Sequence, residues 1–247
     1  LRTVDPAAET KHRVTQVVLP RSPMSSTHNQ GPDIGYYDEG VGEAVVLLHA
    51  SAASRRQWKR LREEIGGSYR LSALDLHGYG ETRFPEDENG LPLGGGCRID
   101  REVALVERVL AGIDARFHLV GHSYGGAVAL HTALRHRERV RSVFVHEPVL
   151  FHLLRLEGCE KEWRESESLG ELVAERVEGG REEDAARAFV EYWSGPGSWD
   201  EIPEKRRPRM AAAARKAVLD FEALFAIQNP LVDYPDLGVP VYLTAGN

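Results

Sequence analysis

The segment Gly121-His-Ser-Tyr-Gly125 is the part of the sequence best suited to chemistry, because it sets one serine between two glycines in the pattern G-x-S-x-G. An apolar run at 117–120 precedes it and a nearly all-apolar segment at 127–134 follows it, so the pattern predicts a sharp turn between a strand and a helix. Such a turn lifts the Ser123 hydroxyl clear of the sheet, where the helix dipole favours developing negative charge. We therefore expect Ser123 to be a nucleophile. The alternative is a glycine-rich turn that only packs the helix on the sheet.

The sequence also indicates the strands and helices that would position this serine, most of them within the first 150 residues. Short apolar runs predict strands, and segments with apolar residues three and four apart predict the helices between them. The strands are expected near 45–48, 71–76, 117–120, 143–145 and 239–244. A capping box of Ser54 and Gln57 should open the first helix, and Asp100 should cap the second. Alternating strands and helices predict an α/β fold with a parallel sheet.

The alternation stops after Pro148 and resumes only at Val239. Between them the texture is helical, and 25 of the 60 residues from 151 to 210 are charged. Three of the four tryptophans also fall there, at Trp163, Trp193 and Trp199. We expect a helical insert with a charged outside and an aromatic inside.

Composition restricts the class of protein. The 247 residues carry a net charge of −7, with 42% hydrophobic and 28% charged residues, which is typical of a soluble globular chain. No excess of basic residues is available to neutralise phosphates, so we expect no nucleic-acid partner. No apolar run approaches the roughly 20 residues that span a bilayer. Cys97 and Cys159 cannot form a disulfide framework or a cysteine zinc cage, so a reducing cytoplasmic location is expected. The oligomeric state is not determined by the sequence.

From residue 33 onward the sequence resembles the α/β-hydrolase family. The resemblance rests on Leu48-His-Ala-Ser51, on Asp75-Leu-His-Gly-Tyr-Gly80, on the serine turn and on the helical insert. It implies a mostly parallel, doubly wound sheet with a helical cap. Residues 1–150 would form the first part of the core and 151–236 the cap, and the core would resume at 237–247.

The resemblance also implies two backbone donors for an oxyanion. In this family one is the N–H after the nucleophile, here Tyr124, and the other comes from the loop after the first buried strand, here Ser51. Ala50 stands where the family prefers glycine, so the second donor is either Ala50 or Ser51. The alternative for Ser51 is a polar loop residue that caps the next helix.

The sequence identifies the acid and the base of a catalytic triad less completely than the nucleophile. The family order is serine, acid, histidine, with the histidine after the last strand. That strand and its loop lie outside the 247 residues, so the chain is interpreted as C-terminally truncated and is expected to be nearly inactive. The acid usually lies a few residues beyond Gly246. In a minority of the family it follows the preceding strand, where Glu147 stands. Glu147 is therefore the candidate acid, and the alternative is a carboxylate that only binds backbone.

No histidine of the sequence occupies the family position for the base. His49 lies in a motif turn and is expected to be structural. His118 and His122 have a spacing that binds zinc on a helix, but they fall on a strand and a turn, so no metal is expected. His146 and His152 follow the strand at 143–145 and could approach the pocket.

These residues predict a serine hydrolase that cleaves a small or medium, partly apolar ester through an acyl-enzyme. The partner is a small-molecule substrate, and no cofactor or metal is implied. A C–C bond hydrolase or a cofactor-free perhydrolase uses the same residues, and a non-catalytic binding protein is the alternative of a different class. Serine at the turn argues against epoxide hydrolases and haloalkane dehalogenases, which are similar in fold but use aspartate there.

Overall fold

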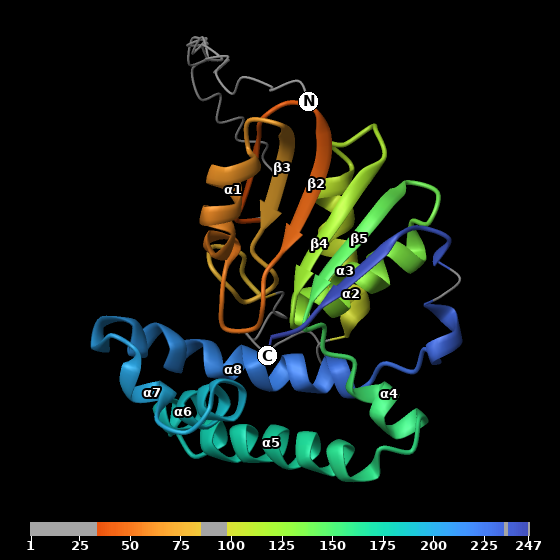
Figure 1. Ribbon diagram of the computed structural model, residues 1–247. Helices are drawn as coiled ribbons and strands as arrows, with labels where there is room; N and C mark the ends of the chain where they lie inside the picture. Colours follow the sequence, from red (N-terminus) through yellow and green to blue (C-terminus); the bar gives the residue numbers. More distant parts are fainter. Residues whose placement is uncertain (1–33, 85–97, 235–236, 247) are drawn as a thin grey trace, which may run out of the picture. The chain divides into compact units, whose positions relative to one another are not determined.

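The computed structural model describes residues 34–84, 98–234 and 237–246, which belong to one compact unit spanning Pro32–Asn247. The first thirty-three residues of the expected core and the polar loop at 85–97 therefore lie outside the described residues. The described part is built on a six-stranded sheet with helices on both faces (Figure 1).

The sheet has the order β1-β3-β2-β4-β5-β6, in which only β1 runs antiparallel to its neighbour. Its strands are β1 (Tyr36–Glu39), β2 (Glu43–Leu48), β3 (Tyr69–Leu74), β4 (Phe117–His122), β5 (Val140–His146) and β6 (Val241–Thr244). From β2 the chain crosses to β3 on one side and returns to β4 on the other. Ligands of such sheets bind at the carboxyl ends of the strands where this reversal occurs.

Two apolar layers hold the helices against the sheet. One face of β2 and β3 packs on η1 (Arg55–Trp58) and α1 (Lys59–Ile65) through Trp58, Leu61 and Ile65. The opposite face packs on α2 (Ile99–Leu110) and α3 (Tyr124–Arg135), and most of α3 is buried. The fold class and the five strands expected from the apolar runs are confirmed.

Between β5 and β6 the described chain is helical, as the loss of the strand pattern predicts. Figure 1 shows these helices gathered beyond the carboxyl ends of the strands. They are α4 (Phe151–Leu156), α5 (Glu160–Glu178), α6 (Glu182–Ser194), α7 (Ser198–Glu201), η2 (Glu204–Arg206), α8 (Arg207–Phe225) and η3 (Leu231–Asp233). Their interior is aromatic: Phe151 stacks on Phe221 and Phe225, and Trp163 meets Phe225 edge-on. None of the described helices is long and apolar enough to cross a bilayer.

Two expected helix caps are wrong. The Ser54 side chain makes no capping hydrogen bond, and the Gln57 amide oxygen instead accepts from the Ala50 N–H at 3.2 Å. Asp100 does not cap α2 because the helix begins one residue earlier, at Ile99, with Arg98 in the capping position.

Candidate active site

Ser123 occupies a strained turn between β4 and α3. Its backbone has φ +53° and ψ −119°, a region that residues other than glycine rarely adopt. The turn is tight on both sides: a Cβ on Gly121 would lie 2.4 Å from the Gly125 carbonyl oxygen, and one on Gly125 would lie 2.4 Å from the His49 carbonyl oxygen. The Ser123 N–H donates to the His146 carbonyl oxygen at 2.9 Å, which ties the turn to β5.

A cavity of about 850 Å³ opens in front of Ser123, a size ordinary for a small-molecule site. Its polar wall contains Ser51, His122, Ser123 and Glu147, from the ends of β2, β4 and β5. Its opposite wall is apolar and comes largely from the helices after β5. Those apolar residues include Val149, Leu150, Phe151, Leu153, Leu154, Phe189 and Trp193.

The backbone groups proposed as oxyanion donors border the same space. Tyr124 is the first residue of α3, where N–H groups point out of the helix end. Ser51 lines the cavity directly after β2, next to Ala52, whose φ is +58°. The Ala50 N–H is already engaged by Gln57, which favours Ser51 over Ala50 as the second donor. Ser51 does not cap the next helix, because its hydroxyl donates to Asp220 in α8 at 2.5 Å.

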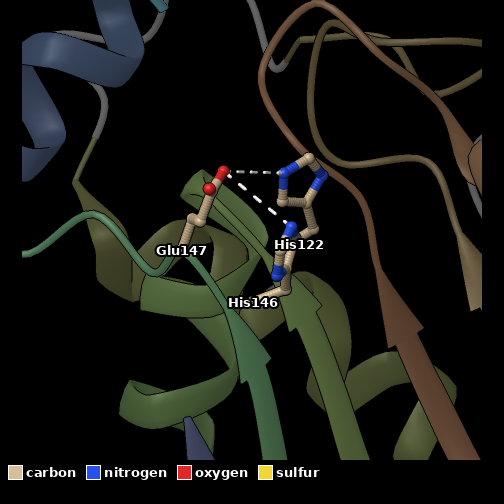
Figure 2. Close-up of side chains that lie close together, drawn as sticks. All are labelled: His122, His146 and Glu147. Atoms are coloured by element: carbon tan, nitrogen blue, oxygen red, sulfur yellow. Dashed lines mark ion pairs between the residues drawn. The ribbon is translucent and has the colours of Figure 1, made fainter. Parts of the chain in front are cut away.

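Glu147 follows β5 directly and is held from two sides. Its φ is +46°, and its N–H donates to the Thr244 carbonyl oxygen at 2.8 Å. One carboxylate oxygen, Oε1, accepts from the Gly246 N–H at 2.8 Å. The other, Oε2, lies 4.0 Å from His122 Nε2 and 3.9 Å from His146 Nε2, as Figure 2 shows. Glu147 therefore binds backbone, as the alternative predicts, and also presents a carboxylate oxygen to imidazoles.

The histidines separate into structural and exposed groups. His49 is fully buried: Nδ1 donates to the Ala50 carbonyl oxygen at 2.7 Å and Nε2 accepts from the Leu76 N–H at 2.9 Å. Burial lowers the pKa of His49 to about 4, in keeping with the expected structural role. His118 contacts Ser142 and Glu43, and His122 lies beside His146 instead.

Burial also lowers the pKa of His122, and the neighbouring His146 adds to this effect. The remaining candidate from the sequence, His152, is not part of this cluster. It is buried among the helices, where its Nε2 lies 3.2 Å from the Tyr234 hydroxyl.

A buried network that the sequence does not reveal reaches the site through Ser51 and Asp220. Asp220 accepts from Ser51, from the Tyr79 hydroxyl at 2.6 Å and from the Lys216 ammonium. Lys216 also donates to Glu102 at 3.1 Å, and all of these side chains except Ser51 are nearly or fully inaccessible. Burial raises the pKa of Asp220 against the opposing effect of Lys216, and burial beside Asp220 raises the pKa of Tyr79. In the sequence, the only sign of this network is that Lys216 and Asp220 are four residues apart. That spacing is also typical of an ion pair on a helix surface.

The two tryptophans beside the 194–198 turn have different surroundings. Trp199 is fully buried, whereas Trp193 is 48% exposed and lines the cavity. Trp199 therefore fills the core of the helical layer, and Trp193 is available to a ligand.

Residues 45–247 match the family model described as the alpha/beta hydrolase family. The chain belongs to this family. Its fold agrees with that of an α/β hydrolase from Sphaerobacter thermophilus, with a TM-score of 0.65 at 17% identity over 87% of this chain and 78% of the other.

Curated family relatives match the chain over about half of its residues. A haloalkane dehalogenase of Agrobacterium fabrum is 33% identical over 49% of this chain and 37% of its own length. A 2-hydroxymuconate semialdehyde hydrolase of a Pseudomonas species is 28% identical over 55% of this chain and 47% of its own. A pimeloyl-[acyl-carrier protein] methyl ester esterase of Neisseria meningitidis is 33% identical over 40% of this chain and 34% of its own length. Each match thus covers less than half of the α/β hydrolase relative.

Proposed function

We propose that the protein is a serine hydrolase that cleaves a small or medium, partly apolar ester. The observation that carries the proposal is Ser123 at φ +53°, in a glycine-bounded turn at the head of α3 and on the wall of a cavity of about 850 Å³. Ser123 attacks the ester carbonyl, and the alkoxide leaves to give an acyl-enzyme. Water then releases the acid and regenerates Ser123.

The surrounding residues have defined roles in this proposal. The N–H groups of Tyr124 and Ser51 stabilise the oxyanion, and Glu147 orients the imidazole that takes the Ser123 proton. The helices between β5 and β6 act as a cap, because they supply the apolar wall that faces Ser123. Similarity to a methyl ester esterase supports ester chemistry. A haloalkane dehalogenase is also similar to the chain, but Ser123 stands where such enzymes are expected to use an aspartate.

A fluorophosphonate tests the nucleophile directly. It should modify Ser123, located by peptide mass mapping, and the Ser123→Ala variant should remain unmodified. A buried serine elsewhere, such as Ser166, provides the comparison within the same digest. Modification at a different serine with Ser123 untouched would refute the assignment.

The base can be located by ester turnover in two further variants. We expect slow Ser123-dependent turnover of p-nitrophenyl esters by these 247 residues, because His122 and His146 pair with Glu147 and not with Ser123. His122→Gln and His146→Gln should then lower this rate little. Rapid turnover that either variant abolishes would identify an internal base and contradict this expectation.

A C–C bond hydrolase is the second candidate, favoured by the similarity to the 2-hydroxymuconate semialdehyde hydrolase. Both reactions need a nucleophile or an activated water, an oxyanion site and an imidazole. They differ in the leaving group, which is an alkoxide in one case and a carbanion in the other. Ser123-dependent cleavage of a vinylogous 1,5-diketone in preference to a matched methyl ester would select the second candidate.

A further inference from the structure

His122, His146 and Glu147 converge at the carboxyl ends of β4 and β5 (Figure 2). The two histidines are directly paired in the parallel register of β4 and β5, and their rings lie 5.1 Å apart between centroids. Glu147 is the next residue after β5. The backbone thus fixes the placement of all three side chains, because two belong to paired strands and the third is held by β6 through Thr244.

The separation of the three side chains is close to that of a metal site. One ligand atom from each residue can be chosen so that all lie within 4.8 Å of one another. Nitrogen and oxygen ligands of a tetrahedral zinc ion are about 3.4 Å apart, given metal–ligand bonds of about 2.1 Å. Metal binding therefore requires the three side chains, which are 31–49% exposed, to rotate so that their ligand atoms approach by up to about 1.4 Å.

His146 and Glu147 each use one polar atom in a hydrogen bond and turn the other toward the centre of the cluster. Thr244 Oγ1 lies 3.0 Å from His146 Nδ1 and donates to the Val145 carbonyl oxygen at 3.5 Å, so it accepts the proton of Nδ1. The lone pair of His146 Nε2 then points toward Glu147. The Gly246 N–H occupies Glu147 Oε1 and leaves Oε2 to face the histidines. Ligating histidines and carboxylates are commonly oriented by such second bonds.

At 3.9 and 4.0 Å, the contacts between Glu147 Oε2 and the imidazoles are too long for hydrogen bonds. Among the described residues, His122 and His146 are the ion-pair partners of Glu147, so no lysine or arginine neutralises its charge. Two imidazole nitrogens and one carboxylate oxygen therefore face one another, and no described lysine or arginine pairs with Glu147.

We propose that His122, His146 and Glu147 form a binding site for a divalent transition-metal ion of zinc-like preference. Two imidazoles and one carboxylate suit Zn²⁺, whereas Mg²⁺ and Ca²⁺ prefer oxygen ligands alone. His122 and Glu147 line the cavity, so a fourth position faces it and is open to water or a small anion. Glu147 has a role in both proposals, so the test below measures zinc binding itself and not the chemistry proposed for Ser123.

Zinc binding to the metal-stripped chain, measured by competition with a chromophoric chelator, tests the proposal. The wild type should bind one equivalent of Zn²⁺, and His146→Gln and Glu147→Gln should each weaken binding about tenfold or more. His136→Gln is the matched control, because His136, the residue after α3, forms a comparable histidine–carboxylate pair: its Nε2 lies 2.9 Å from Glu107 of α2. This control should bind as the wild type does, and a large excess of Mg²⁺ should not compete.

Two readouts keep the test decisive if a variant folds poorly. Zn²⁺ should raise the Tm of the wild type and of His136→Gln but not that of His146→Gln. X-ray absorption at the zinc edge of the wild-type complex should show two imidazole ligands. Equal affinity in the wild type and folded His146→Gln, or fewer than two imidazoles, would overturn the proposal. Equal weakening in His136→Gln would also overturn it, because it would indicate binding at scattered surface histidines.

Discussion

Two polar clusters near Ser123 differ in how completely their polar groups are hydrogen-bonded. The buried network of Lys216, Asp220, Glu102, Tyr79 and Ser51 satisfies its charged and hydroxyl groups within the protein. The cluster of His122, His146 and Glu147 is half-exposed, and its inner nitrogen and oxygen atoms face one another without a hydrogen bond.

This difference separates a positioning role from a binding role. A buried ionic network is costly to disturb because each removed partner leaves a desolvated charge. Through Asp220, α8 fixes the Ser51 loop beside Ser123. The cluster of His122, His146 and Glu147, called the open cluster below, should contribute little to the unfolding free energy. Its nitrogen and oxygen atoms that lack hydrogen bonds can bind a ligand or a proton. The predictions below test this division.

The largest effect is expected at Lys216. Replacing Lys216 with Met keeps much of its packing but leaves the Asp220 and Glu102 carboxylates buried without their ammonium partner. Unfolding free energy should fall by about 3–5 kcal/mol, as for other broken buried ion pairs. Urea denaturation measures the change. A double variant, Lys216→Met with Asp220→Asn, should recover part of the loss, and no recovery would show that the two side chains do not act together.

A smaller effect follows from pH. His49 packs edge-on against Tyr79 of the buried network, and its folded pKa of about 4 lies below the unfolded value of about 6.5. The unfolded chain therefore binds the extra proton between these values, so stability falls as pH falls from about 6.5 towards 4.

At pH 5 this should cost on the order of 1–2 kcal/mol relative to pH 7. His131, whose pKa burial also lowers to about 4, acts in the same direction. Urea midpoints at pH 7 and 5 measure the loss, and His49→Gln should show a weaker pH dependence than the wild type. An unchanged pH dependence in this variant would contradict the assignment to His49.

Trp193 should matter for substrate choice and little for stability. Trp193 lines the cavity that contains Ser123, and 48% of the residue is exposed. Trp193→Ala should change the ratio of kcat/KM for short and long acyl p-nitrophenyl esters by about tenfold. Leu156→Ala, at an exposed position of α4 away from the cavity, is the control and should leave the ratio unchanged. Equal ratios in the wild type and Trp193→Ala would mean that this wall does not contact the acyl group.

The smallest effect is expected in the open cluster. His146→Gln removes a side chain that is 42% exposed, so the unfolding free energy should change by no more than about 0.5 kcal/mol in the absence of metal. Thermal denaturation in the presence of a chelator measures it. A loss as large as that of Lys216→Met would remove the distinction between the two clusters.

The sequence predicts the elements of the core and the turn that carries Ser123, because both are local patterns. Apolar runs mark β2 to β5, and the glycines around Ser123 are required by contacts within a few residues and with the His49 backbone. The pairing of His122 with His146 could also have been inferred, since each ends one of two consecutive parallel strands.

The buried network could not be predicted in this way. Ser51 and Asp220 meet across 169 positions of the chain, and Tyr79 and Asp220 meet across 141. Nothing near Lys216 distinguishes it from a solvated lysine except the small residues around it, such as Ala214 and Ala217. The Ser54 capping box fails for a related reason, because the Ala50 backbone takes the glutamine that the box requires.

Among the described residues, the non-glycine residues with left-handed backbone are Ala52, Ser123 and Glu147. They follow β2, β4 and β5, so backbone strain is concentrated around one end of three neighbouring strands. A glycine would adopt each conformation without the steric cost of a Cβ. A serine and a glutamate thus occupy two positions whose backbone carries a steric cost that glycine would avoid. Backbone strain of this kind is concentrated at sites where the side chain itself is needed for chemistry.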